Sequence, residues 1–253
     1  MNQTTCKPSE HLVTMLHPGT IASESFKTLR TNISLNDFDH KIKVINVVSA
    51  NSQEGKTTVS ANLAYTYSQL GKKVLLMDLD LRLSSLHKKL KLKNKVGIVD
   101  TFTGNISFNE AVIHYAKNFD VLLSGSKTSY SAELIQSEAF KNFLNKLRDL
   151  YDFIIIDCPP INLVADGMIA SALADGTIMC VANNSDEKKE LLRAKEALKQ
   201  FDINLLGVVI TKVPAAKKYY KKYDYGKKHG YGYGYGYGYG YGYFKEVETE
   251  EKK

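Results

Sequence analysis

Residues 49–58, which read Ser-Ala-Asn-Ser-Gln-Glu-Gly-Lys-Thr-Thr, have the types and spacing needed to bind phosphate. An apolar run at 44–48 precedes this stretch, and a helix-like pattern begins at Val59. A loop between a strand and a helix directs its backbone N–H groups toward the positive end of the helix, where phosphates bind. Lys56 would then reach the β- and γ-phosphates, and the Thr57 hydroxyl would bind Mg²⁺.

Ala50 departs from the usual phosphate-loop pattern, which has Gly at that position. The tripeptide at 55–57 is a weak signal by itself, and its place between a strand and a helix gives it weight. We therefore expect ATP-binding residues throughout the loop: Asn51, Ser52, Gln53, Glu54, Gly55, Lys56, Thr57 and Thr58.

Three carboxylates lie where chemistry is expected in an open α/β sheet. Asp78 and Asp157 each end an apolar run, and ligands bind at such strand ends. Asp80 and Arg82 follow Asp78 at alternate positions, so an extended chain would point all three the same way. A single Asp at a strand end could equally cap a helix or a turn. Three such residues beside a phosphate loop favour a functional site over three separate caps.

Phosphoryl transfer needs Mg²⁺, neutralised charge and a positioned acceptor oxygen. Asp157 fits a carboxylate that binds Mg²⁺ directly or through water, because Mg²⁺ keeps several waters. One further carboxylate could orient or deprotonate the acceptor. From the residues alone, that acceptor could be water or a hydroxyl group.

Apolar runs and helical patterns alternate along most of the chain, which predicts an α/β fold with a mostly parallel central sheet and helices on both faces. Short helices are expected within 83–115. The longer predicted helices span 23–35, 59–70, 133–150, 161–173 and 186–201. The predicted strands include 44–48, 121–123, 153–157, 176–182 and 205–211.

The chain divides by composition into three segments. Residues 1–19 read as a loose N-terminal arm, and 20–214 read as one domain. Residues 215–253 read as a flexible tail, because Gly and Tyr alternate without exception from 230 to 243 and aliphatic side chains are almost absent.

Charge and cysteine content narrow the function classes. The net charge of +7 comes largely from Lys-rich stretches at 88–95 and 217–228, without any groove-reading motif, so we expect no nucleic acid partner. The three cysteines have no metal or disulfide spacing, which indicates a reducing compartment. No apolar run is long enough to span a bilayer, so the expected location is the cytoplasm.

Tyrosines are concentrated in the tail, which holds eleven of the sixteen. A sticky low-complexity linker is one interpretation. Beside a predicted ATP site, a flexible tyrosine array also looks like a substrate carried on the same chain. The candidate phosphorylation sites are Tyr219, Tyr220, Tyr223, Tyr225, Tyr231, Tyr233, Tyr235, Tyr237, Tyr239, Tyr241 and Tyr243.

Taken together, the motifs at 55–57, 75–82 and 154–160 and the tyrosine-rich tail resemble those of bacterial tyrosine kinases (BY-kinases), which have a P-loop NTPase-like fold. The resemblance is to the stand-alone cytoplasmic type of Gram-positive capsular and exopolysaccharide operons. Ser84 and Ser131 stand where members of that family usually have Pro.

The resemblance implies roles for individual residues. Lys56, Asp78, Asp80 and Asp157 would be catalytic, with Asp78 as base toward the tyrosine hydroxyl. Thr57, Asp80 and Asp157 would bind the metal, although the residues alone do not separate Asp78 from Asp80. Thr211 and Lys212 would lie near the adenine, where related ATPases often have Asn-Lys.

Glu24, Lys27 and Arg30 are spaced three apart on one helix face. This pattern suits a solvated helix with an i, i+3 ion pair or a subunit contact. In the family, a Glu-x-x-Arg-x-x-Arg helix lies at the interface of a homo-oligomeric ring. Lys27 replaces an Arg of that pattern and lacks its planar fork.

The function implied is an ATP- and Mg²⁺-dependent protein tyrosine kinase that autophosphorylates its tail in trans and regulates polysaccharide synthesis and export. A membrane polysaccharide co-polymerase would activate it and recruit it to the inner face of the plasma membrane, and a cognate tyrosine phosphatase would reverse the reaction. The alternatives are a Min/Par-like positioning ATPase and a nucleotide-gated scaffold.

Overall fold

The computed structural model describes residues 9–37, 39, 41–183 and 188–214. Two compact units are distinguished, 1–212 and 213–253, and the description below concerns the first. The eleven candidate tail tyrosines lie outside the described residues.

The core of the first unit is a seven-stranded sheet in the order β3-β4-β2-β5-β1-β6-β7. Every neighbouring pair is parallel except β3–β4. The predicted α/β fold with a mostly parallel sheet is therefore confirmed. The strands are β1 Val44–Ser49, β2 Val74–Asp78, β3 Ile113–Ala116, β4 Phe119–Leu122, β5 Phe153–Asp157, β6 Gly176–Ala182 and β7 Leu205–Thr211.

Ten helices are found in the described part of the chain: α1 Val13–Leu16, α2 Ile21–Asn36, α3 Lys56–Ser68, α4 Leu86–Lys89, α5 Ile98–Phe102, α6 Phe108–Ala111, α7 Ser131–Gln136, α8 Glu138–Leu150, α9 Asp166–Leu173 and α10 Lys188–Gln200. None of them is long and apolar enough to cross a bilayer.

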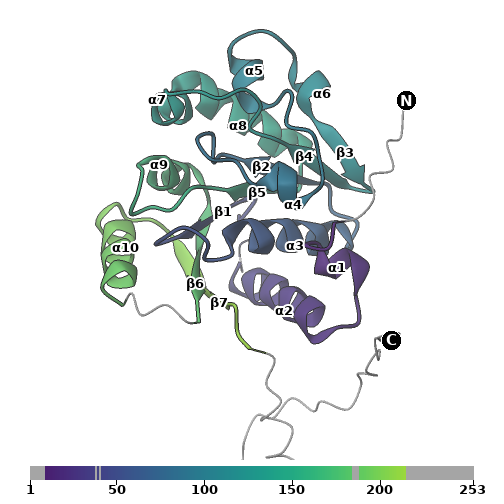
Figure 1. Cartoon of the computed structure of the whole chain (residues 1–253), viewed down its shortest axis with the longest axis vertical. Helices are drawn as coiled ribbons and strands as arrows, with labels where there is room; N and C mark the ends of the chain where they lie inside the picture. Colours follow the sequence, from purple (N-terminus) through teal and green to yellow (C-terminus); the bar gives the residue numbers. More distant parts are fainter. Residues whose placement is uncertain (1–8, 38, 40, 184–187, 215–253) are drawn as a thin grey trace, which may run out of the picture. The chain divides into compact units, whose positions relative to one another are not determined.

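Helices cover both faces of the sheet because strand side chains alternate between the faces. On β2, Leu75 and Met77 pack in the core cluster shared with α7 to α10, whereas Val74 and Leu76 pack in the cluster shared with α2 and α3. Figure 1 shows α2 and α3 on one side of the sheet and α7 and α8 on the other.

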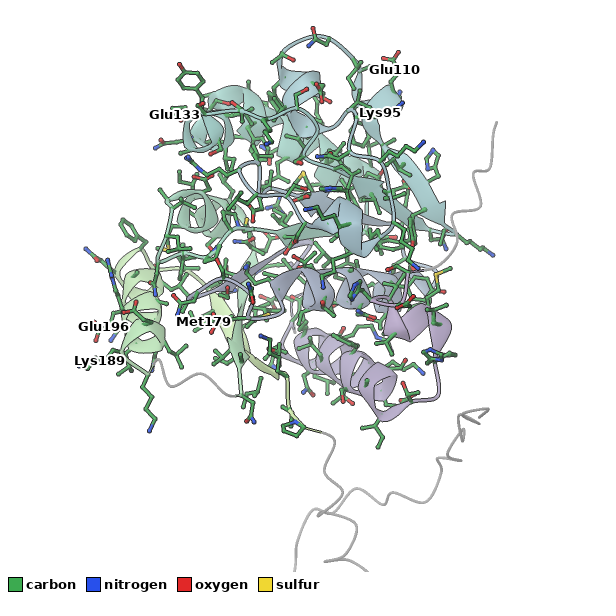
Figure 2. The ribbon with its side chains drawn as sticks, in the orientation of Figure 1. Lys95, Glu110, Glu133, Met179, Lys189 and Glu196 are labelled. Carbon is green, nitrogen blue, oxygen red and sulfur yellow. The ribbon has the colours of Figure 1, made fainter. Side chains whose placement is uncertain are left out.

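Helix α10 illustrates how an amphipathic helix covers the sheet. Met179 of β6 is fully buried, while Lys189 and Glu196 extend outward from α10 (Figure 2). Ala194 and Leu198 on the inner face of the helix are buried in the same cluster as Met179.

The helix predicted over 133–150 is in fact two helices, α7 and α8. Ser137 separates them with an extended backbone, and its hydroxyl oxygen accepts the Phe140 N–H at 3.1 Å. This cap begins a new helix, which the apolar periodicity alone does not reveal. The sequence also did not predict β3, a four-residue strand that pairs antiparallel with β4.

The expectation of a loose arm is wrong for residues 9–19. Leu12 is fully buried in the core cluster on the α3 side of the sheet. The backbone N–H and hydroxyl of Thr14 donate to Asn62 Oδ1 of α3 at 3.0 and 2.9 Å. One apolar anchor and a buried polar pair therefore hold this segment on the domain, and the remaining domain boundaries stay predictions.

Candidate active site

The predicted phosphate loop lies between β1 and α3, with its backbone shaped by two left-handed residues. Gln53 has φ +62° and Gly55, the N-cap of α3, has φ +88°. A Cβ on Gly55 would lie 3.1 Å from a side-chain carbon of Thr211. The Thr211 hydroxyl donates to the Glu54 carbonyl at 2.8 Å, so the end of β7 closes against the loop.

The loop is held by its own side chains. The buried Glu54 carboxylate accepts the Asn51 N–H at 2.8 Å, and the Ser49 hydroxyl donates to the Asn51 carbonyl at 2.5 Å. The sequence predicted Glu54 as a nucleotide-binding residue but did not reveal this contact. Ser52 and Gln53 are exposed at the tip, and Lys212 is exposed with φ +53°.

The first turns of α3 bring the predicted phosphate and metal ligands together with Asp157. Lys56 is 8% exposed, and the Thr57 hydroxyl lies 3.1 Å from the Ser85 hydroxyl. Ser60 Oγ lies 3.2 Å from Asp157 Oδ1. Ser60 and Ser85 were not predicted as site residues, because a serine next to other small residues carries no distinguishing signal.

Asp78 and Asp157 are neighbours across the β2–β5 pairing, and they are 0% and 2% exposed. Burial, together with the charge of Asp157, raises the pKa of Asp78 well above its usual value. Burial also raises the pKa of Asp157, although the Thr57 hydroxyl and the Lys56 cation oppose that rise. The two acids therefore lie side by side in a buried position, where the charge of one disfavours ionisation of the other.

The extended chain expected as far as Arg82 ends earlier, because β2 ends at Asp78 and a turn follows at 81–83. Asp80 Oδ1 accepts the Leu83 N–H at 3.0 Å. The Arg82 guanidinium binds the buried Asp166 carboxylate of α9 at 3.1 and 3.3 Å. Asp80 nevertheless remains close enough to affect the pKa of both buried acids.

The donor set fits Mg²⁺, which prefers oxygen ligands and keeps several waters. Thr57, Asp80 and Asp157 supply one hydroxyl and two carboxylates. Within the described residues, no group of three or more His, Cys, Asp or Glu side chains could form a cage around a metal. A cation at this edge would therefore depend on water and phosphate oxygens as well as on the protein.

On α2, the residues predicted at a subunit contact make contacts within the chain. Lys27 Nζ lies 2.6 Å from Glu24 Oε1, so the i, i+3 ion pair is present. Arg30 donates to the Thr66 carbonyl of α3 at 2.7 Å, which ties the two helices together.

The chain is similar to proteins of known class. Residues 42–187 match the family model described as an AAA domain. Tyrosine-protein kinase YwqD of Bacillus subtilis is 37% identical over 217 residues, 85% of this chain and 90% of the relative.

Solved structures of several proteins are similar to this chain in fold. The chimerical protein CapA2B2 is 31% identical with a TM-score of 0.79, covering 83% of this chain and 93% of that chain. The kinase domain of Escherichia coli tyrosine kinase ETK is 25% identical with a TM-score of 0.75, covering 93% and 88%. MinD from Pyrococcus horikoshii, complexed with Mg-ADP, shares the fold with a TM-score of 0.58 at 24% identity, covering 69% and 72%.

A mostly parallel sheet with a phosphate loop between a strand and a helix defines the P-loop nucleotide-binding class. Within that class, the chain belongs to the bacterial tyrosine-protein kinase family, as the motifs predicted. The roles of its individual site residues stay predictions.

We expect Gly55→Ala to weaken ATP binding by about 10-fold or more, because the new Cβ meets Thr211 and the left-handed backbone costs about 1–2 kcal/mol. The matched control is Gly71→Ala, whose φ of +81° has the same cost but whose Cβ would meet nothing within 4 Å. Titration with a fluorescent ATP analogue measures both. Equal affinities for the two variants would show that loop closure against Thr211 does not shape the nucleotide site.

Proposed function

We propose that the chain transfers the γ-phosphoryl group of ATP to tyrosine hydroxyls, including those of its own tail, and thereby regulates capsular or extracellular polysaccharide synthesis and export. The observation that carries the proposal is the buried Asp78–Asp157 pair beside the phosphate loop. The kinase names of relatives that align over most of their length support it.

In the proposed reaction, the loop N–H groups and Lys56 bind the ATP phosphates. Thr57, Asp80 and Asp157 would hold Mg²⁺, which when bound would neutralise charge on the phosphates. The tyrosine oxygen forms a bond to the γ-phosphorus, the bond from that phosphorus to the ADP oxygen breaks, and Asp78 accepts the phenolic proton. The products are phosphotyrosine and ADP.

Asp78 suits the base better than Asp80 for two reasons. Its burial raises its pKa, which makes it a stronger base than an ordinary carboxylate. Asp80 is only partly buried, and a partly exposed carboxylate can bind a hydrated cation. These observations favour Asp80 on the metal side and Asp78 toward the acceptor.

Phosphorylation in trans would place the tail of one subunit in the site of its neighbour in a homo-oligomeric ring. We propose that Glu24, Lys27 and Arg30 form the ring contact. The intrachain pair of Glu24 and Lys27 would then exchange partners across the interface. Arg30 has further N–H donors beyond the one bound to Thr66 and could contribute them.

The partners in this proposal rest on the family resemblance. A membrane polysaccharide co-polymerase would supply an activating cytoplasmic segment and recruit the kinase to the inner face of the plasma membrane. A cognate tyrosine phosphatase would remove the phosphates. A positioning ATPase and a scaffold have less support, because the likeness to MinD is one of fold alone.

We expect Lys56→Met to lower phosphotyrosine formation by at least about 100-fold, since a cation on the transferred phosphate is lost. Lys72→Met, at an exposed site outside the loop, is the control. Intact mass after incubation with ATP and Mg²⁺ measures the product. A folded Lys56→Met protein with full phosphorylation would overturn the loop assignment. Phosphate release without phosphotyrosine would identify an ATPase, and nucleotide binding with neither product would identify a scaffold.

For the ring, we expect exchange of the two charges, Glu24→Lys with Lys27→Glu, to give monomers while preserving the ion pair within α2. Arg30→Glu is less clean, because it also removes the bond to Thr66. Sedimentation velocity reports the assembly. An unchanged oligomer in the exchanged variant excludes this contact.

Phosphorylated wild-type protein should also be more monomeric, because each phosphate adds roughly −1.5 to −2 charges. Replacing every tail tyrosine by Phe should leave the protein oligomeric and without phosphate on the tail. Unchanged assembly after extensive tail phosphorylation would contradict this switch.

A further inference from the structure

We propose that His87 and Ser84 are positioning residues for Asp78, holding its carboxylate in the orientation from which it accepts the tyrosine proton. This inference rests on the proposed role of Asp78 as base.

Both carboxylate oxygens of Asp78 have a partner from the segment that follows β2. Oδ1 accepts the Asp80 N–H at 3.1 Å, and Oδ2 accepts the Ser84 hydroxyl at 2.5 Å. The same Ser84 oxygen lies 3.1 Å from Nδ1 of His87. A continuous chain of side-chain hydrogen bonds therefore leads from Asp78 through Ser84 to His87.

Helix α4 fixes the outer end of this chain. Leu86, the residue before His87, is fully buried in the core cluster that includes residues of α3. His87 is only partly buried, so its ring lies at the boundary between that core and the surface. The packing of Leu86 therefore fixes the backbone position from which the His87 side chain reaches Ser84.

The number of available protons determines which group donates in each of these hydrogen bonds. A serine hydroxyl has a single proton, so while Ser84 donates to ionised Asp78 it can only accept from His87. Burial, together with the charge of Lys88, lowers the pKa of His87, which favours the neutral ring. A neutral imidazole has one ring proton, and here that proton must be on Nδ1.

The direction of these hydrogen bonds matters because a donor at His87 orients the Ser84 hydroxyl proton toward Asp78. With His87 as donor, Ser84 is committed to Asp78 Oδ2, and the remaining lone pairs of that carboxylate stay available for the phenol. Without the chain, a fully buried carboxylate loses a partner and its orientation is no longer fixed. The loss should appear in the chemical step more than in ATP binding, because the hydrogen bonds of Ser84 and His87 lead to Asp78, the proposed base.

The test uses the full chain with ATP, Mg²⁺ and a tyrosine peptide. Ser84→Ala and His87→Ala should each lower kcat by about 10-fold, less than the roughly 10²–10⁴-fold that a general base itself contributes, with KM for ATP nearly unchanged. The double variant should be no slower than either single variant, because the two residues act in series. Thermal unfolding confirms that each variant is folded.

Conservative variants give the matched controls. His87→Asn can present an N–H near the position of Nδ1 and should recover most of kcat, whereas His87→Gln places its amide farther out and should not. Ser84→Thr keeps the hydroxyl and should also recover kcat. Nitrogen NMR of labelled histidine supplies a second readout: His87 should be the Nδ1–H tautomer in wild type and a mixture in Ser84→Ala.

Unchanged kcat in both alanine variants, or an Nε2–H tautomer of His87 in wild type, would overturn the inference. Asp78→Asn separates its failure from that of the proposed function. If Asp78→Asn retains kcat, the base assignment itself is wrong. If Asp78→Asn loses kcat while the alanine variants keep it, only the positioning role is wrong.

Discussion

Asp78 and Asp157 lie opposite each other at the ends of two buried strands. The register of the β2–β5 pairing holds the two residues next to each other. Each is desolvated, and each raises the energy of the other when both are ionised. The surroundings offset part of this cost: Lys56 supplies a cation, and hydroxyls of Thr57, Ser60 and Ser84 supply hydrogen bonds. Most other features of the site can be understood as ways to hold this pair in place.

The architecture meets that demand through rigid elements. Helices on both faces bury β2 and β5 completely except near Phe153, so the strand ends cannot shift to relieve the repulsion. The phosphate loop is closed by Glu54 and Thr211 through bonds to its own backbone. Bound cation and nucleotide would therefore meet a site formed in advance, and Mg²⁺ would relieve the repulsion between the carboxylates.

Much of the fold could be predicted because short, continuous apolar runs alternate with helical patterns along the chain. The strands at 176–182 and 205–211 were predicted with the bounds observed for β6 and β7. The break at Ser137 and the docking of Leu12 could not be predicted, because one depends on a local cap and the other on tertiary packing.

In the site, the sequence indicated the acids and the loop, since these follow strand ends. It did not indicate Ser60, Ser85 or His87, whose contacts exist only after α3 and α4 pack beside the sheet. Short polar side chains are common near any loop, and no spacing distinguishes the few that meet a buried carboxylate.

The energetic cost of the buried pair can be measured directly as the difference in unfolding free energy between Asp78→Asn and wild type. The measurement is made without nucleotide at about pH 8 and about pH 5. Because the folded-state pKa of Asp78 is raised, its carboxylate destabilises the protein above the unfolded-state pKa, and this penalty grows as the pH rises. The variant should therefore be more stable than wild type at the higher pH, with a smaller advantage at the lower pH. A variant that is less stable than wild type by the same amount at both pH values would show that the pair is not under electrostatic strain.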